Sequence, residues 1–320
     1  MFYISAASSI SHQPTFKNAG FSAFIGPLTE SSALVSPDYK GFIEAGLLRR
    51  MSKILRMSVA CSKDCIEQAG IEQPNAIVVG TGLGCLQDTE KFLNNSITIE
   101  GLLPPTAFIQ STHNTMAGQI SLSIGNHGYN MTHTQNTLSF EHALQDAMLL
   151  LNEGEKHILV GAADEYIEIL TEISGQLNIR PETLLASGAS FFVLSKEKTT
   201  ASLAVVKDCV TTGLVQDIPE KIASFLSDNG LKASDLDLIL YSGASNGLNH
   251  DDVFLKTLPA SLGKCVDYLQ LSGIYPTASA FALHYAADLM NQNKSLKNIL
   301  IYNSLIQRNL GLTLVQSIEA

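Results

Sequence analysis

The chain contains an internal duplication of α/β units. Residues 75–92, NAIVVGTGLGCLQDTEKF, and residues 236–254, LDLILYSGASNGLNHDDVF, each read as a short apolar strand, a glycine-rich turn and the polar start of a helix. An amphipathic helix pattern that ends at glycine precedes each of them, over residues 52–69 and 219–229. A fold with two similar halves is therefore the first expectation.

A second pair of segments has the same element order. In residues 139–161 and again in residues 279–303, a serine opens a buried-looking helix, a polar loop ends it, and an apolar strand follows. The strands are near-continuous apolar runs, which is typical of strands covered on both faces. We expect two α/β halves, each with a central sheet between helices. The alternative is that such units recur by chance in any α/β protein.

Composition and charge exclude several classes of protein. Of the 320 residues, 45% are hydrophobic and 16% are charged, so the chain can bury a large core. A net charge of −10 argues against a nucleic-acid partner and against anionic membrane surfaces. The N-terminal sequence lacks a secretion signal pattern, and no apolar stretch reaches the roughly 18 residues of a membrane helix. Membrane insertion is not expected.

The cysteines and histidines do not follow metal-binding patterns. The five cysteines lack CxxC spacing and are odd in number, and the eight histidines form no HxxxH or HExxH motif. We expect a reduced, cytoplasmic protein with no metal and no cofactor. Cys61 and Cys65, four residues apart on one helix face, are interpreted as core residues. Cys85 follows GTGLG, which superficially suggests phosphate binding but lacks the third glycine spacing of a dinucleotide fingerprint.

Residues 124–163 carry the strongest family signal. They read IGNHGYNMTHTQNTLSFEHALQDAMLLLNEGEKHILVGAA, and this stretch resembles the β-ketoacyl synthases of the thiolase superfamily from the strand before the nucleophile elbow to the strand after the next helix. Eight residues match the family without a gap: Gly125, Gly128, Asn130, Thr132, His142, Ala143, Ala147 and Gly154. On this alignment Thr137 occupies the position of the catalytic cysteine.

Two further loops resemble the histidine motifs of the same family. SGASNGLN, residues 242–249, is similar to HGTxTxLN but has Ser242 in place of the first histidine. SGIYPTASA, residues 272–280, is similar to TGHxxGAAG but has Ile274 in place of the second. Asn303 and Ser304 match the opening of the family's NSFGFGG stretch.

The resemblance implies a fold and an assembly. It implies an α/β thiolase fold of two duplicated halves in a five-layered αβαβα arrangement. We expect the first half, with the degenerate elbow, over residues 1–200 and the second over residues 201–320. In this superfamily the strand before the elbow pairs with its counterpart across a dimer, which here implicates residues 130–134. The chain is shorter than a typical synthase, so some insertions that build the cleft and the dimer surface are expected to be trimmed.

The three replacements remove the family's chemistry. A thiolate at a helix N-terminus takes up the acyl chain, whereas a threonine hydroxyl ionises far above neutral pH and needs an adjacent base. Isoleucine cannot donate a hydrogen bond to a developing enolate. We therefore expect no active catalytic residue at Thr137, Ser242 or Ile274. A compensating constellation, with Ser242 beside one of His113, His133 or His250, is the alternative.

Three functions remain open. The first is a non-catalytic partner of an active ketosynthase, similar to the chain-length factors of polyketide and aryl-polyene systems, which form heterodimers and work with acyl carrier protein. Those factors commonly have glutamine at the cysteine position, and Gln135 lies two residues away. The second is a degenerate synthase that retains malonyl decarboxylation, acyl transfer or thioester hydrolysis. The third is a homodimeric acyl-binding scaffold.

Four residues are candidates for contact with the acyl chain. Gln135 and Asn136 are polar residues beside the Thr137 position, and we expect them to face the pocket that binds the acyl chain in active synthases. Residues 102–116 are expected to be ordered but not one continuous helix because of their prolines. Within them, Phe108 and Met116 are candidate tunnel stoppers; the alternative is that both fill the core.

Overall fold

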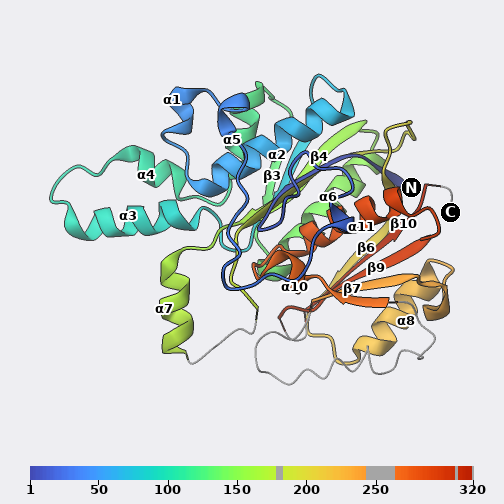
Figure 1. The fold of residues 1–320 in the computed structure, drawn as a ribbon. Coiled ribbons are helices and arrows are strands. Elements are labelled where there is room, and N and C mark those ends of the chain that lie inside the picture. Colours follow the sequence, from blue (N-terminus) through green and yellow to red (C-terminus); the bar gives the residue numbers. More distant parts are fainter. Residues whose placement is uncertain (178–182, 243–263, 307–308, 319–320) are drawn as a thin grey trace.

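The computed structural model describes residues 1–177, 183–242, 264–306 and 309–318. In these ranges ten strands form a sheet in the order β3-β2-β4-β5-β1-β6-β10-β9-β7-β8 (Figure 1). The strands of the first half are β1 Phe2–Ile10, β2 Ala76–Gly80, β3 Tyr129–His133, β4 His157–Asp164 and β5 Gly188–Ser195. Those of the second half are β6 Ala204–Thr212, β7 Leu238–Tyr241, β8 Lys264–Asp267, β9 Asn298–Asn303 and β10 Leu310–Gln316.

The two sets of strands have the same topology. β2 lies parallel to β3 and β4, just as β7 lies parallel to β8 and β9. β5 lies antiparallel to β4 and β1, and β10 lies antiparallel to β9 and β6. A short antiparallel pairing of β1 with β6 joins the sets. The duplication predicted from the sequence is therefore confirmed, while the exact domain boundary at residue 200, between β5 and β6, stays a prediction.

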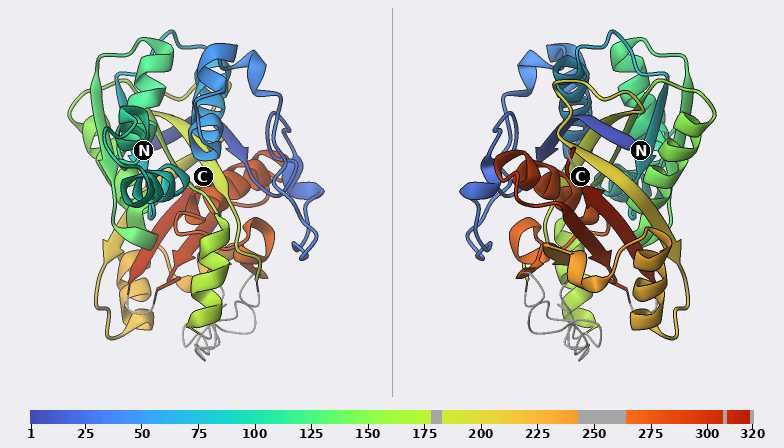
Figure 2. Two further views of the ribbon diagram at one scale, coloured as in Figure 1. Left: turned by 90° about the vertical axis from the view of Figure 1, so that its left-hand side faces the viewer. Right: turned by 90° about the vertical axis from the view of Figure 1, so that its right-hand side faces the viewer.

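Helices cover both sets of strands and also separate them. The described α-helices are α1 Ala45–Leu48, α2 Lys53–Ala69, α3 Leu86–Thr98, α4 Pro105–Gln110, α5 Thr115–Ile124, α6 Ser139–Asn152, α7 Glu168–Gln176, α8 Ile218–Asp228, α10 Leu269–Ser272 and α11 Ser279–Gln292. In Figure 2 the long helix α2 lies at the top, α11 in the middle and α8 at the bottom.

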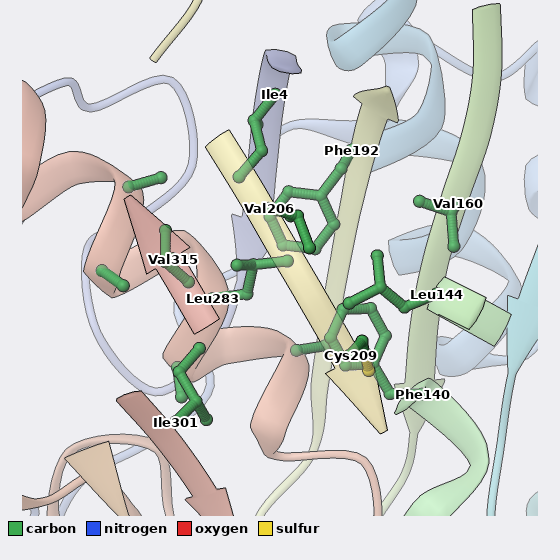
Figure 3. Packing of buried hydrophobic residues seen from close by; sticks show 14 of the residues in the cluster. Ile4, Phe140, Leu144, Val160, Phe192, Val206, Cys209, Leu283, Ile301 and Val315 are labelled. Atoms are coloured by element: carbon green, nitrogen blue, oxygen red, sulfur yellow. The ribbon is translucent and has the colours of Figure 1, made fainter. Parts of the chain in front are cut away.

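The strand residues alternate between a shared inner core and two outer cores. In β2, Val78 packs into the inner core with α6 and α11, whereas Val79 faces α2 and α5. In β9, Ile301 packs into the same inner core, whereas Leu300 faces α8. Figure 3 shows the inner core, with side chains from α6, α11 and strands of both halves. Because successive strand residues point to opposite faces, this pattern gives five layers, α-β-α-β-α, and confirms the predicted fold.

Local sequence signals set the helix ends. α2 ends at Gly70, whose φ of 63° is the left-handed conformation that favours glycine. α8 begins after Asp217, whose carboxylate accepts a hydrogen bond from the Glu220 N–H at 2.9 Å. The central helices α6 and α11 both begin at a serine, as predicted.

Helices α3 and α4 extend away from the body of the molecule (Figure 1). Residues 102–116 contain α4, a turn and the start of α5, so the expected interruption of the helix is confirmed. Apolar side chains of α3, α4 and the linker between them are exposed: Leu93, Ile97, Ile99, Leu102, Phe108 and Ile109. None of the helices in the described ranges combines the length and apolar character needed to cross a bilayer.

Candidate functional site

A tight turn, residues 134–138, connects β3 to α6, and we call it the elbow. Asn136 has a φ of 54°, a left-handed conformation that is uncommon outside glycine and enriched in asparagine. The Ser139 Oγ lies 2.7 Å from the Asn136 carbonyl oxygen and 2.9 Å from that of Thr81, which fixes the turn against the end of β2. A strained turn between a strand and a buried helix is the geometry of a nucleophile elbow.

Thr137 lies inside the elbow. It is only 3% exposed, and its Oγ1 has no hydrogen-bond partner within the described residues. Its carbonyl oxygen accepts a hydrogen bond from the Asn303 Nδ2 at 2.8 Å. Asn303 is the last residue of β9, so a residue of the second half holds the elbow of the first.

Asn303 also bonds to a buried carboxyl group. Its Nδ2 lies 2.8 Å from the Glu141 Oε1, and Glu141 is 1% exposed. Burial raises the pKa of Glu141, and the hydrogen bond from Asn303 opposes the rise. Glu141 was not identified as a site residue from the sequence. The available signal was its carboxyl group in the first turn of FEHALQDAM, a helix that the sequence predicts to be buried.

Ser242 and Ile274, the other two positions predicted to be replaced, lie in loops near the elbow. The Ser242 Oγ, at the end of β7, accepts a hydrogen bond from the Ser304 N–H at 2.8 Å, one residue beyond Asn303. The Ile274 N–H donates to the Leu184 carbonyl oxygen at 2.7 Å. Two residues later, Pro276 packs so closely against Gly82 that a Cβ on that glycine has no room. The Asn136 carbonyl lies beside the same glycine.

The turn before α11 corresponds to the elbow and has its own buried partner. Thr277 precedes α11 as Thr137 precedes α6, and its Oγ1 and N–H donate to the Asp164 Oδ2 at 2.8 and 3.1 Å. Asp164 ends β4 and is fully buried. Burial raises the pKa of Asp164, and its hydrogen-bond donors oppose the rise. Thus each half supplies a terminal strand residue that holds the turn of the other half.

The backbone amides of the GTGLG turn, residues 80–84, bind the same Asp164 carboxylate. The N–H groups of Gly82 and Leu83 donate to the Asp164 Oδ1 at 3.0 and 2.9 Å, and the Gly84 N–H donates to the Thr81 Oγ1 at 2.9 Å. These amides therefore bind the protein itself, as a structural strand-to-helix turn requires. Cys85 is fully buried behind the turn, and Cys61 and Cys65 are buried as predicted.

The histidines considered from the sequence do not pair with the elbow in the described ranges. His133 Nε2 lies 2.9 Å from the Asp146 Oδ2, and His113 is exposed and packs against Gly84. His250, with residues 243–249 of the SGASNGLN motif, lies outside the described residues. No cluster of three or more potential metal ligands is found in the described part of the chain.

The candidate acyl-contact residues occupy different environments. Gln135 and Asn136 are exposed at the elbow, and Met116 is fully buried between α5 and α2. Phe108 is 58% exposed, with its ring centroid 5.4 Å from that of Phe92. The alternative that Phe108 fills the core of this chain does not hold, because α4 lies on the projecting hairpin. Its place at a tunnel stays a prediction.

Comparisons with known proteins agree with this geometry. The family model described as "Beta-ketoacyl synthase, N-terminal domain" matches residues 30–216, more than half of the chain. No curated protein matches the sequence.

Several solved structures match over nearly the whole chain. The ishigamide ketosynthase/chain length factor is 16% identical, with 99% of both chains covered and a TM-score of 0.82. A type II PKS acyl-carrier protein in complex with its ketosynthase, AntDE:AntF, gives 15% identity, 99% coverage of both chains and a TM-score of 0.78. The ketosynthase ApeO with its chain length factor ApeC, from Xenorhabdus doucetiae, gives 12% identity, coverage of 99% of this chain and 98% of that one, and a TM-score of 0.74.

Proposed function

The chain belongs to the β-ketoacyl synthase family, and we propose that it is a non-condensing subunit that pairs with an active ketosynthase, in the manner of a chain-length factor. The observation that carries the proposal is the chemistry of the elbow. Thr137 has a buried hydroxyl, and no imidazole hydrogen-bonds to it within the described residues. Without a base, a threonine hydroxyl is not a nucleophile at neutral pH.

The surroundings of Thr137 support the same conclusion. Its carbonyl oxygen accepts a hydrogen bond from the Asn303 amide, which also bonds to the Glu141 carboxyl. Burial raises the pKa of Glu141, which favours the neutral acid. Ser242 and Ile274 do not supply the imidazoles that the family uses for decarboxylation. The elbow is thus proposed to be a structural element that has lost its reactive group.

The edge of the sheet supports association with a second thiolase-fold chain. β3 ends the strand order, so in the described residues only one of its edges is paired, with β2. Tyr129 and Met131 on this strand are 41% and 40% exposed. Exposed edge strands favour pairing with another strand, and β3 of a partner is the complement we propose. The total buried area is expected to exceed about 2,000 Å², as in obligate dimers.

The projecting α3–α4 hairpin fits the same interface. Its exposed side chains include Ile97 at 82%, Leu102 at 100% and Phe108 at 58%. Such apolar side chains favour burial against a partner subunit. We propose that Phe108 enters the interface, where it limits the length of the acyl chain. Acyl carrier protein is the proposed source of that chain, and the cytoplasm the proposed compartment.

Two of the similar structures support the proposed partners. One is a ketosynthase with its chain length factor, and one is an acyl-carrier protein with its ketosynthase. The relation is one of fold, because the identities are 15% and 12%.

Co-expression with an active ketosynthase from the same source tests the proposal. We expect a one-to-one heterodimer that condenses acyl and malonyl groups on carrier protein. Replacing the partner's nucleophilic cysteine by alanine is expected to abolish condensation, whereas Thr137→Ala in this chain leaves it unchanged. Activity that depends on Thr137, or a stable monomer in the presence of the partner, contradicts the proposal.

A further inference from the structure

A cavity of about 240 Å³ lies where three separate segments of the chain meet, and we call it the Lys198 cavity. The segments are the link between β5 and β6, the C-terminal end of α11 with the turn after it, and the residues that follow β10. Sites for drug-sized ligands usually measure about 300–1,000 Å³, so a ligand of this cavity must be small.

The Lys198 cavity lies at the end of α11 that is remote from the elbow. α11 begins beside the elbow, because Pro276, just before the helix, and the Asn136 carbonyl both lie against Gly82. Met290, which lines the cavity, follows the first residue of α11 by eleven positions, or about 16 Å at the rise of an α-helix. The cavity is therefore separate from the candidate site described above.

Two ammonium groups lie at the cavity. The Lys198 Nζ donates to the Ile318 carbonyl oxygen at 3.3 Å, and the Lys294 Nζ donates to the Asn291 Oδ1 at 3.2 Å. Both acceptor residues line the cavity, so these contacts place the two cations at its wall. Each ammonium has three donors, and these contacts use one donor of each. Neither lysine forms an ion pair within the described residues, and both are exposed to an incoming ligand.

Hydroxyl groups add further donors to the wall. The Ser202 Oγ accepts a hydrogen bond from the Thr199 N–H at 2.9 Å and lies 3.3 Å from the Thr199 Oγ1. Whichever hydroxyl donates in the second contact, the other keeps a proton that is free for a ligand. Ser317 is 7% exposed, and its Oγ has no hydrogen-bond partner in the described part of the chain. The wall thus offers hydroxyl donors as well as cations.

Carboxylates are absent from the lining that the described residues provide. Asp288 of α11 does not line the cavity, and its two oxygens accept hydrogen bonds from the N–H groups of Gly20 and Ser22 at 2.7 and 3.0 Å. Glu197, in the link between β5 and β6, is exposed and does not line it either. A pair of cations without an acidic partner, in a chain of net charge −10, gives this cavity a local attraction for anions.

We propose that the Lys198 cavity binds a phosphate group, free or on a small ester, between the ammonium groups of Lys198 and Lys294. A phosphate monoester carries a charge of about −1.5 to −2 at pH 7 and three strong acceptor oxygens, which matches two cations and additional hydroxyl donors. A carboxylate has a single charge and two oxygens, so it satisfies fewer of these groups. The side chains of Leu203 and Met290 provide an apolar wall for the carbon part of an ester.

Calorimetric titration of the full chain in a phosphate-free buffer at pH 7.5 tests the proposal. Inorganic phosphate and glycerol 3-phosphate are the probes, and the one that binds more tightly identifies the source of the phosphate group. Acetate at the same ionic strength is expected not to bind. Lys198→Ala and Lys294→Ala are each expected to weaken binding roughly tenfold, because each removes a charge-assisted hydrogen bond. Lys221→Ala is the matched control, because this exposed lysine lies on α8 and changes the net charge equally.

Thermal unfolding provides a second measurement. Phosphate that binds the folded chain should raise the melting temperature of the unaltered protein and of Lys221→Ala, with a smaller rise for Lys198→Ala and Lys294→Ala. Because the altered side chains are exposed, all three variants are expected to fold. No saturable binding of either probe, acetate binding as tight as that of phosphate, or equal affinities of the three lysine variants overturns the proposal.

Discussion

Asn303 connects the two halves of the molecule at the elbow, and its removal is expected to be costly. Its Nδ2 donates to the Thr137 carbonyl and to the Glu141 Oε1, each at 2.8 Å. All three residues are at most 3% exposed, so water cannot replace the lost donor. Leaving a buried acceptor unsatisfied costs about 1–3 kcal/mol, and two acceptors are affected. Asn303→Ala is therefore expected to lower the free energy of unfolding by about 2–6 kcal/mol.

Urea unfolding monitored by circular dichroism measures this loss. Asn298→Ala is the matched control at the other end of β9, where the side chain is only partly buried and bonds to the Asp235 carbonyl and to Gln316. We expect the control to lose about 1 kcal/mol. Hydrogen exchange of residues 134–140 is expected to accelerate in Asn303→Ala and not in the control. Equal losses for the two variants, or a loss below about 1 kcal/mol for Asn303→Ala, refute the reasoning.

Four further predictions follow from single side chains. Burial raises the pKa of Glu165 from 4.5 to about 7, so between these pH values the folded state holds a proton that the unfolded state releases. The free energy of unfolding should therefore fall by about 3 kcal/mol as the pH rises through this window. Glu165→Gln should not show this fall, as urea titrations at pH 5 and 8 measure. Gly161→Ala places a methyl group on the Phe191 ring and should cost about 1–3 kcal/mol by the same assay; an unchanged melting temperature contradicts it. Thr137→Cys should not create a condensing enzyme, because Ser242 and Ile274 remain; product formation by the variant alone contradicts this. Phe108→Ala should change the free energy of unfolding of the isolated chain by less than about 1 kcal/mol. In the reconstituted pair the same change should lengthen the acyl products, which mass spectrometry measures. An unchanged product distribution removes Phe108 from the tunnel.

Features with a local sequence signal were predicted well. The strand, turn and helix order recurs in both halves, so the duplication and the positions of α6 and α11 followed from apolar periodicity and from the serines that open these helices. The end of α2 at Gly70 followed from glycine's preference for positive φ. The family resemblance added the five-layered arrangement, which periodicity alone does not specify.

Features that depend on distant contacts were missed. Asn303 and Thr137 are 166 residues apart, and Asp164 and Thr277 are 113 apart, so no local pattern connects them. The alternative that Phe108 fills the core failed because the exposure of an aromatic ring depends on where its helix packs, and α4 projects from the body.

Intact-protein mass spectrometry tests the central claim most directly. The purified chain is incubated with acyl carrier protein that carries an acyl thioester, and an active ketosynthase serves as the positive control. The account predicts that the ketosynthase gains the mass of the acyl group while this chain keeps its unmodified mass. An acyl adduct on this chain, mapped to the peptide that contains Thr137, would contradict the claim that the elbow has lost its nucleophile.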